Sequence, residues 1–325
     1  MTESVHLIEA LDRRVERRTE RREFFRTAIG MGALAAGGVA ALSLSSAASA
    51  QAAAVTDADI LNLALNLEYL EAQFYSFAVN GTGLPEAQLT GTVGTRGQVT
   101  GGRKANLTDQ SVIQYAREIA ADEIAHVAAL RTALGGSAIA QPAIDISDTV
   151  FTAAARAANI DLTATGGVFS PYANDDSFLL GAYIFEDVGV TAYKGASPLI
   201  TNVDIVDAAA GILAAEAFHA GIIRGSLYAR GVALPVLRTN ADRISDARDS
   251  LDGSSDIDQG ISPMGTGAAI MSNFVPTDPN GIVFSRTSEQ VHNIVYLTRT
   301  QVTAGGFFPA GTNNANPALR RSGAN

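Results

Sequence analysis

Four segments of the chain combine helical length with apolar residues that recur every three or four positions. They cover residues 57–79, 109–134, 175–195 and 203–230. Each holds roughly 20–28 residues and would be about 30–40 Å long, which is the length of a long bundle helix. The pattern predicts an all-α fold, an antiparallel four-helix bundle.

The segments between and after these helices differ in kind. Residues 81–106 are crowded with glycine and threonine, which predicts a long loop that holds a short β-hairpin. A short helix is expected at residues 148–157. After Pro235 the apolar period weakens, so we interpret residues 51–235 as the bundle domain and residues 236–325 as an extension packed on it, with a fifth helix at 288–297.

The first 50 residues have the pattern of an export signal. Arg21 and Arg22 are followed, after one spacer, by two phenylalanines, and residues 27–50 carry no charge and end in Ala-Ser-Ala. This resembles a cleaved twin-arginine signal peptide, which predicts recognition by the twin-arginine export machinery and a periplasmic or secreted protein. The alternative is an uncleaved N-terminal membrane anchor. No later segment approaches 18 uninterrupted apolar residues, so we expect no membrane partner after cleavage.

Composition excludes or disfavours several classes of partner and functional site. The chain has 325 residues, 47% of them hydrophobic, which suffices for a substantial core. Its formal charge of −10 disfavours nucleic acid as a partner. The absence of cysteine excludes a disulfide scaffold, a thiolate zinc site, a cysteine nucleophile and a cysteine-ligated iron–sulfur cluster. A homo-oligomer is compatible with all of these observations.

Two of the helical segments carry a glutamate followed three residues later by a histidine. These pairs are Glu123 with His126 and Glu216 with His219. Residues at i and i+3 share one face of a helix, and both pairs are flanked by apolar residues, so we expect them to point into the core. A buried ionised carboxylate costs several kcal/mol unless it is paired or binds a metal. Two such pairs in one chain favour a single reason for the burial of both carboxylates.

The other two helical segments supply a matching pattern, a glutamate followed by a tyrosine seven residues later. Glu68 precedes Tyr75, and Glu186 precedes Tyr193. The order of the two helix types repeats along the chain, so a bundle with pseudo-twofold symmetry would gather four glutamates and two histidines at its centre. Six ligands of mixed oxygen and nitrogen type suit two iron or two manganese ions bridged by carboxylates. A metal-free polar network in a decayed site is the alternative.

The arrangement resembles the ferritin-like di-iron and di-manganese carboxylate superfamily. Within it, the chain is most similar to the desiccation-related, ferritin-like domain proteins. The resemblance covers residues 57–311 and rests on LNLEYLEAQFY at 65–75, FEDVGVTAYKGA at 185–196, AAEAFH at 214–219, DIDQG at 256–260 and GGFFPAG at 305–311.

This resemblance implies a role for each candidate residue. Glu68 and Glu186 would each be a terminal ligand of one metal, Glu123 and Glu216 would bridge, and His126 and His219 would each bind one metal. Glu71, one turn after Glu68, would be a proton-accepting base or an extra ligand, unless it is a solvated helix residue. Tyr75 and Tyr193 would donate hydrogen bonds that orient ligands, unless they only pack.

Residues beside the candidate ligands carry weaker signals. Asp122 and Asp187 adjoin ligands but point about 100° away around their helices, so we assign them no role. Arg131 and Arg224 each follow a motif histidine by five positions. We interpret them as surface residues or carboxylate partners. His292 lies outside the motif and is interpreted as structural.

Two classes of function follow from these patterns. The first is a di-metal oxidoreductase, catalase-like or peroxidase-like, that acts on peroxide or O₂ in oxidative or desiccation stress. The second is a non-catalytic protein that protects against stress or sequesters metal, with a structural or decayed metal site. Iron storage in a hollow cage is disfavoured, because the long loops and the extension would obstruct a compact bundle exterior.

Overall fold

The structure is a computed structural model in which residues 55–325 are described. The export signal predicted at residues 1–50 lies outside the described residues.

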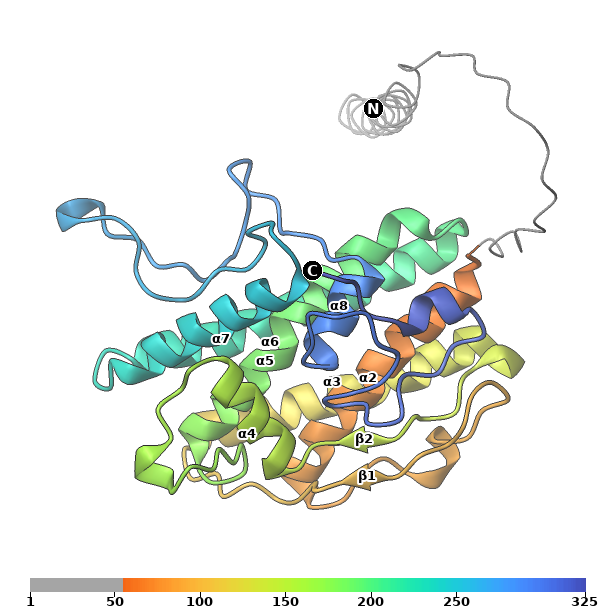
Figure 1. The fold of residues 1–325 in the computed structure, drawn as a ribbon, viewed down its shortest axis with the longest axis horizontal. Helices are drawn as coiled ribbons and strands as arrows, with labels where there is room; N and C mark the ends of the chain where they lie inside the picture. Colours follow the sequence, from red (N-terminus) through yellow and green to blue (C-terminus); the bar gives the residue numbers. More distant parts are fainter. Residues whose placement is uncertain (1–54) are drawn as a thin grey trace, which may run out of the picture. The chain divides into compact units, whose positions relative to one another are not determined.

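Four long helices form the bundle that the apolar pattern predicts. They are α2 (Asp57–Asn80), α3 (Gln110–Leu134), α5 (Asp175–Ala196) and α6 (Val203–Arg230). Helix α2 packs along α3 and α5 packs along α6, and the two pairs meet through contacts of α2 with α5 and of α3 with α6 (Figure 1). The predicted all-α four-helix bundle is confirmed, and the helix ends agree with the sequence pattern to within one residue.

Side-chain caps fix where these helices begin. The Thr56 side chain accepts a hydrogen bond from the Asp59 backbone N–H while the Asp59 carboxylate accepts from the Thr56 backbone, which is a capping box at the start of α2. Asp109, Asn174 and Asn202 cap α3, α5 and α6, each accepting from a backbone N–H of the first turn. Such caps set the register of the ligand-bearing turns along each helix.

An aromatic cluster holds α2 against α5 at one end of the bundle. Phe74 of α2 stacks on Phe178 of α5 with ring centroids 5.7 Å apart, and Phe185 meets Phe307 of the C-terminal segment at 4.9 Å. Phe151 joins them from α4 (Asp148–Ala157), the short helix expected there. Full burial of one such ring contributes about 1.5–3 kcal/mol, so the cluster rigidly positions the neighbouring ligand turns.

The prediction of a β-hairpin within residues 81–106 is wrong. The strand in this loop, β1 (Val99–Thr100), pairs in parallel with β2 (Ile144–Asp145), which follows α3 in the chain. A glycine- and threonine-rich segment shows where backbone can pair but not with which partner. The close approach also requires glycine, because a Cβ on Gly97 would lie 2.1 Å from the Ala143 backbone nitrogen.

The C-terminal segment adds two helices to the bundle. The fifth helix predicted from the sequence is α8 (Ser288–Val295), which packs on α5. A further helix, α7 (Val236–Asp252), was not predicted; it packs on α5 and α6 and also on α8 (Figure 1). His292 in α8 is buried and hydrogen-bonded to the Ser288 carbonyl and to Thr312, as a structural histidine would be.

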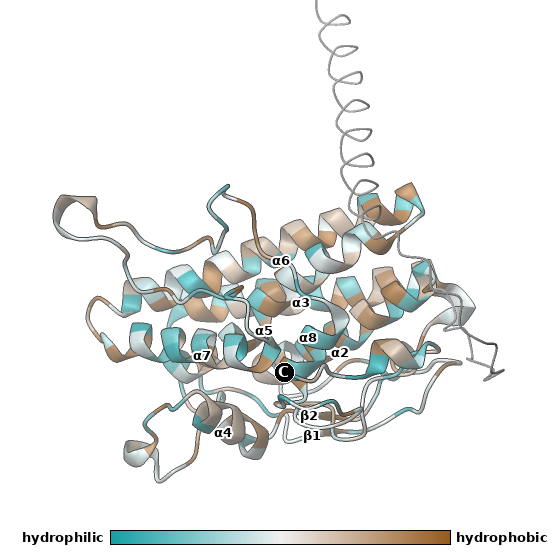
Figure 2. Cartoon of the chain, turned by 45° about the horizontal axis from the view of Figure 1, so that its top comes forward, coloured by the Kyte–Doolittle hydropathy of each residue, from teal (hydrophilic) through white to brown (hydrophobic). Residues whose placement is uncertain are grey.

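Helix α6 is the most apolar of the long helices and α7 is largely polar, as the colouring in Figure 2 makes visible. By length and hydropathy α6 is the one helix in residues 55–325 that could cross a membrane. Its buried face, however, carries Glu216, His219 and Arg224. Because these ionisable side chains are covered by neighbouring helices, α6 packs as a bundle helix.

Candidate metal centre

The bundle gathers the six predicted ligand side chains at its centre. Every one of them is at most 9% exposed. Their ligand atoms form two groups in which all members lie within 4.8 Å of one another. The first group is Glu68, Glu123, His126 and Glu216, and the second is Glu186, Glu216 and His219.

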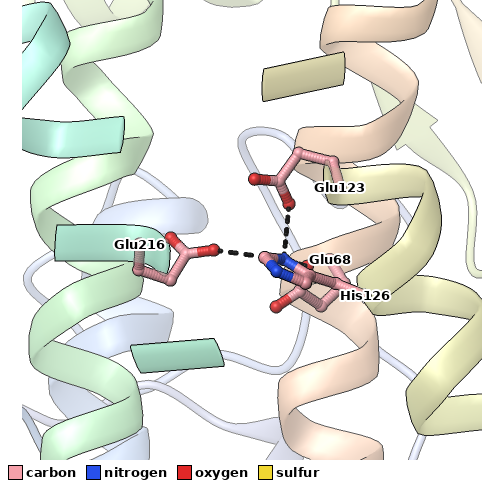
Figure 3. A group of neighbouring side chains, drawn as sticks. All are labelled: Glu68, Glu123, His126 and Glu216. Carbon is pink, nitrogen blue, oxygen red and sulfur yellow. Dashed lines mark ion pairs between the residues drawn. The ribbon is translucent and has the colours of Figure 1, made fainter. Parts of the chain in front are cut away.

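The first group surrounds the Nδ1 atom of His126 (Figure 3). This nitrogen lies 3.2 Å from Glu68 Oε2, 3.6 Å from Glu123 Oε2 and 3.6 Å from Glu216 Oε1. The three carboxylates come from α2, α3 and α6, so three separate helices converge on one imidazole. Atoms at these separations can bind a single cation between them.

The second group repeats this arrangement around His219. Its Nδ1 atom lies 3.0 Å from Glu123 Oε1 and 3.8 Å from Glu186 Oε2. Glu123 therefore turns one carboxylate oxygen toward each histidine, and Glu216 belongs to both groups. With imidazole rings 6.0 Å apart, this is the geometry in which two carboxylates can bridge two adjacent ions.

The donor set fits a pair of divalent cations. Buried ionisable atoms that lack a hydrogen-bond partner are costly, and here they cluster on the ligands themselves. Cations bound between them would satisfy all of these lone pairs at once, and a mixed carboxylate and imidazole set suits iron or manganese. Within residues 55–325 the unpartnered ligand atoms are Glu68 Oε2, Glu123 Oε2, His126 Nδ1, Glu186 Oε2, both Glu216 oxygens and His219 Nδ1.

The carboxyl groups repel one another when no cation separates them. Burial, and then repulsion from neighbouring glutamates, raises the pKa of Glu123 and Glu216 well above the usual range. Burial raises the pKa of Glu186 to about 8. Burial would also raise the pKa of Glu68, but the approach of His126, 3.2 Å away, outweighs it and lowers that pKa. Metal binding here must therefore release protons.

Each of the two predicted tyrosines donates a hydrogen bond to a glutamate in the other half of the repeat. Tyr75 on α2 donates its hydroxyl hydrogen to Glu186 Oε1 on α5, and Tyr193 on α5 donates to Glu68 Oε1 on α2. Each bond occupies one oxygen of a terminal carboxylate and leaves the other, Oε2, facing the centre. The tyrosines thus fix the orientation of two candidate ligand carboxylates, as hydrogen-bond partners of metal ligands commonly do.

Glu71 is buried beside the centre but lies outside both ligand groups. The alternative of a solvated helix residue is therefore wrong. Burial, and then the charge of Glu123, raises the pKa of the Glu71 carboxyl well above its usual range. A carboxyl next to the centre whose protonated form is favoured by burial can donate a proton and take it back.

Sequence reasoning missed Gly189 and assigned no role to Asp122. A Cβ on Gly189 would lie 2.2 Å from Glu216 Oε2, so a larger residue here would push this carboxylate from its position. The Asp122 Oδ2 atom lies 3.1 Å from His219 Nε2 and fixes the imidazole orientation, a correction to its assigned lack of role. The sequence position of Asp122 did not indicate this contact, because it joins α3 to α6.

Asp187 also has a role that the sequence did not indicate. It is buried and accepts hydrogen bonds of 2.8 Å from Arg224 and from Arg248, the latter in the unpredicted helix α7. Arg224 is thus a carboxylate partner, one of its two predicted roles. Arg131 instead donates to the Tyr69 hydroxyl and the Thr90 carbonyl.

Replacing Tyr75 with phenylalanine should weaken metal binding without unfolding the bundle. The variant loses the hydroxyl that orients Glu186, and loss of such a partner typically lowers metal affinity about 10–100-fold. Tyr115→Phe is the matched control, because Tyr115 is exposed on α3. Metal titration with a competing chelator measures the ratio of the metal affinities of the two variants. Equal affinities in the two variants would reduce Tyr75 to a packing residue.

Comparison with known proteins agrees with this geometry. The chain is 30% identical over 276 residues to the desiccation-related protein PCC13-62 of Craterostigma plantagineum, a match that covers 81% of this chain and 85% of the relative. It is also 30% identical over 273 residues to the ferritin-like catalase Nec2 of Nesocodon mauritianus, with 79% and 83% covered. No solved structure matches the chain significantly. The family model of the ferritin-like domain matches residues 56–229, and the chain therefore belongs to the ferritin-like family.

Proposed function

We propose that this protein holds two iron or two manganese ions in its bundle and consumes hydrogen peroxide in stress defence. The observation that carries the proposal is the set of unpartnered carboxylate and imidazole atoms converging from four helices. The ferritin-like catalase of Nesocodon mauritianus, 30% identical, supports peroxide as the substrate. The twin-arginine pattern in residues 1–50 supports action in the periplasm or outside the cell.

In this proposal the ligand roles follow the two groups of side chains. Glu68 with His126 completes one ion site, and Glu186 with His219 completes the other. Glu123 would contact both ions, because its two oxygens face different histidines. Glu216 would do so as well, since it belongs to both groups.

Two such ions supply redox chemistry by exchanging electrons with peroxide. In disproportionation one peroxide takes up two electrons and two protons and becomes two waters, while another gives up the same numbers and becomes O₂. Protons must therefore be stored between the two halves of the reaction. Glu71 suits this task, because it is buried beside Gly189 and Glu216 and its pKa is raised by burial.

Oxygen evolution tests this activity. Manganese- or iron-loaded protein should release O₂ from hydrogen peroxide far faster than the same concentration of free ions. Glu71→Gln should keep its metal and lose about 10²–10⁴-fold in turnover, the usual contribution of a positioned proton donor. Glu118→Gln, an exposed glutamate on α3, is the matched control and should retain full activity. Loaded wild-type protein that is no faster than free ions would refute the peroxide activity.

A second candidate is a non-catalytic protective role. It is favoured by the desiccation-related relative from Craterostigma plantagineum, which is as similar to this chain as the catalase. Such a protein would use its metal to stabilise the bundle, since ions that bind only the folded state raise its stability. Bound metal together with a large rise in melting temperature, but without oxygen evolution, would support this role.

A further inference from the structure

A cavity of about 260 Å³ lies on the outer side of α5 and α6, away from the ligand groups. Its third wall is the segment between α7 and α8, blue in Figure 1. Most of the lining is apolar and includes two aromatic rings. Residues that form it are Val190, Ala217, Ala220, Phe274, Val283 and Phe284. A mostly apolar space of this size suits a small organic ligand with one ring.

Charged side chains close one side of this cavity. Asp187, Arg224, Asp258 and Arg286 all line it, and each is at most 7% exposed. They belong to one buried network of ion pairs with N–O separations of 2.6–2.8 Å, completed by Arg248 and Asp252 beyond the cavity wall.

This network contains three arginines and three aspartates, so its formal charges cancel. A charged ligand would leave an uncompensated charge in a buried place, which is expensive. The cavity therefore favours a neutral ligand.

Four polar atoms of this network remain unpartnered within residues 55–325, and two of them, on Asp187 and Arg224, belong to residues that line the cavity. Asp187 Oδ1 has no donor, although Oδ2 of the same carboxylate accepts from two arginines. Arg224 Nε has no acceptor, although both of its terminal nitrogens donate. A buried donor and a buried acceptor left over in neighbouring residues can be satisfied together by one hydroxyl group, which both donates and accepts.

We propose that this cavity is a binding site for a small neutral phenol or a similar aromatic alcohol. The ring would lie among Phe274, Phe284 and the aliphatic wall, and its hydroxyl would donate to Asp187 and accept from Arg224. The site is separate from the metal centre, although its walls are sequence neighbours of ligands: Asp187 follows Glu186 and Ala217 follows Glu216. Binding requires no metal and does not depend on the proposed peroxide activity.

Ligand-observed NMR titration with three probes tests the chemistry of the site. The probes are 4-ethylphenol, ethylbenzene, which lacks the hydroxyl, and 4-ethylbenzoate, which carries a charge. We expect 4-ethylphenol to bind at least tenfold more tightly than either of the others, both with and without metal. Equal binding of ethylbenzene would remove the role of the Asp187 and Arg224 atoms, and tighter binding of the benzoate would overturn the neutral-ligand argument.

Blocking the cavity tests its location. Gly221 lines it, and a Cβ added to this glycine would meet nothing within 4 Å, so leucine can be introduced there without a clash at Cβ. Gly211→Leu is the matched control, since Gly211 lies on the same helix, equally open but outside the cavity lining. Gly221→Leu should weaken 4-ethylphenol binding at least tenfold and Gly211→Leu should not change it.

A second blocking variant, Ala220→Leu, guards against a leucine at position 221 that turns outward. Helix content and metal content show whether each variant is folded. If both folded blocking variants bind 4-ethylphenol as tightly as Gly211→Leu, the proposed site is wrong.

Discussion

Replacing Gly189 with alanine is expected to cost the protein at least one of its two proposed metal ions. The added Cβ would lie 2.2 Å from Glu216 Oε2, far inside van der Waals contact, and 3.4 Å from Glu71 Oε1. Glu216 is fully buried on α6, so its carboxylate has little room to retreat. Since this residue belongs to both ligand groups, its displacement disturbs both ion positions.

The direction of this effect is diagnostic, because alanine normally stabilises a helix. In a helix interior it is favoured over glycine by roughly 0.5–1 kcal/mol. Gly211→Ala on α6, where a Cβ meets nothing within 4 Å, should show only that gain and keep its metal. Elemental analysis of both purified variants gives the comparison. Full metal content in Gly189→Ala would mean that Glu216 does not bind where we place it.

Replacing Asp258 with asparagine is expected to lower the free energy of unfolding by about 3–5 kcal/mol, the usual result of removing one partner from a buried ion pair. The Asp258 carboxylate accepts from Ser245 Oγ at 2.6 Å, from Arg248 at 2.8 Å and from Arg286 at 2.7 Å. Asparagine has one oxygen and cannot serve all three donors. Two buried guanidinium groups would then lose their shared counter-charge.

Asp256→Asn is the matched control for this change. Asp256 is two residues away and exposed, so its replacement should alter stability by no more than about 0.5 kcal/mol. Chemical denaturation of both variants measures the difference. If Asp258→Asn is as stable as the control, the network that anchors the C-terminal segment contributes little.

The pH dependence of this contribution has a definite sign. Burial alone would raise the pKa of Asp258, but the charges of Arg248 and Arg286 outweigh it and lower that pKa below its usual range. A carboxyl with a depressed folded-state pKa stabilises the protein above its unfolded-state pKa. The difference in free energy of unfolding between Asp258→Asn and the wild type should therefore shrink as the pH falls below about 4.

The bundle and the convergence of its six candidate ligands could be predicted because two independent patterns agree. Apolar periodicity places the four long helices, and the repeated glutamate and histidine spacings place six ligands on their inner faces. Buried carboxylates are rare enough in helices that Glu123 and Glu216 stand out in a row of apolar neighbours. Convergence of all six then follows from the antiparallel packing.

Helix α7 escaped prediction because its buried face is only half apolar. Leu237, Ala241 and Ile244 follow a helical period, but Ser245, Arg248 and Asp252 continue that face. These polar residues are buried only because partners from α5 and from the segment before α8 neutralise them. Such partners cannot be identified before the fold is known, so the apolar period stops well before the helix does.

Contacts between side chains on different helices also could not be predicted from the sequence. Asp122 lies beside a ligand in the sequence, yet it acts on His219 of a different helix. Gly189, by contrast, left a usable sign: it follows Glu186 by three positions, so it shares the face of a ligand in the middle of a helix. Glycine is unfavourable in the middle of a helix, so its presence there indicates that a neighbouring group needs the space of a side chain.

Metal stoichiometry is the most direct measurement of the central claim. The account predicts two iron or manganese ions per chain in the wild type and in Glu118→Gln, whose altered residue is exposed on α3. Glu123→Gln, further along the same helix, should lose both ions, because this carboxylate faces both histidines. A wild-type protein without stoichiometric metal, or a Glu123→Gln variant that keeps two ions, would contradict it.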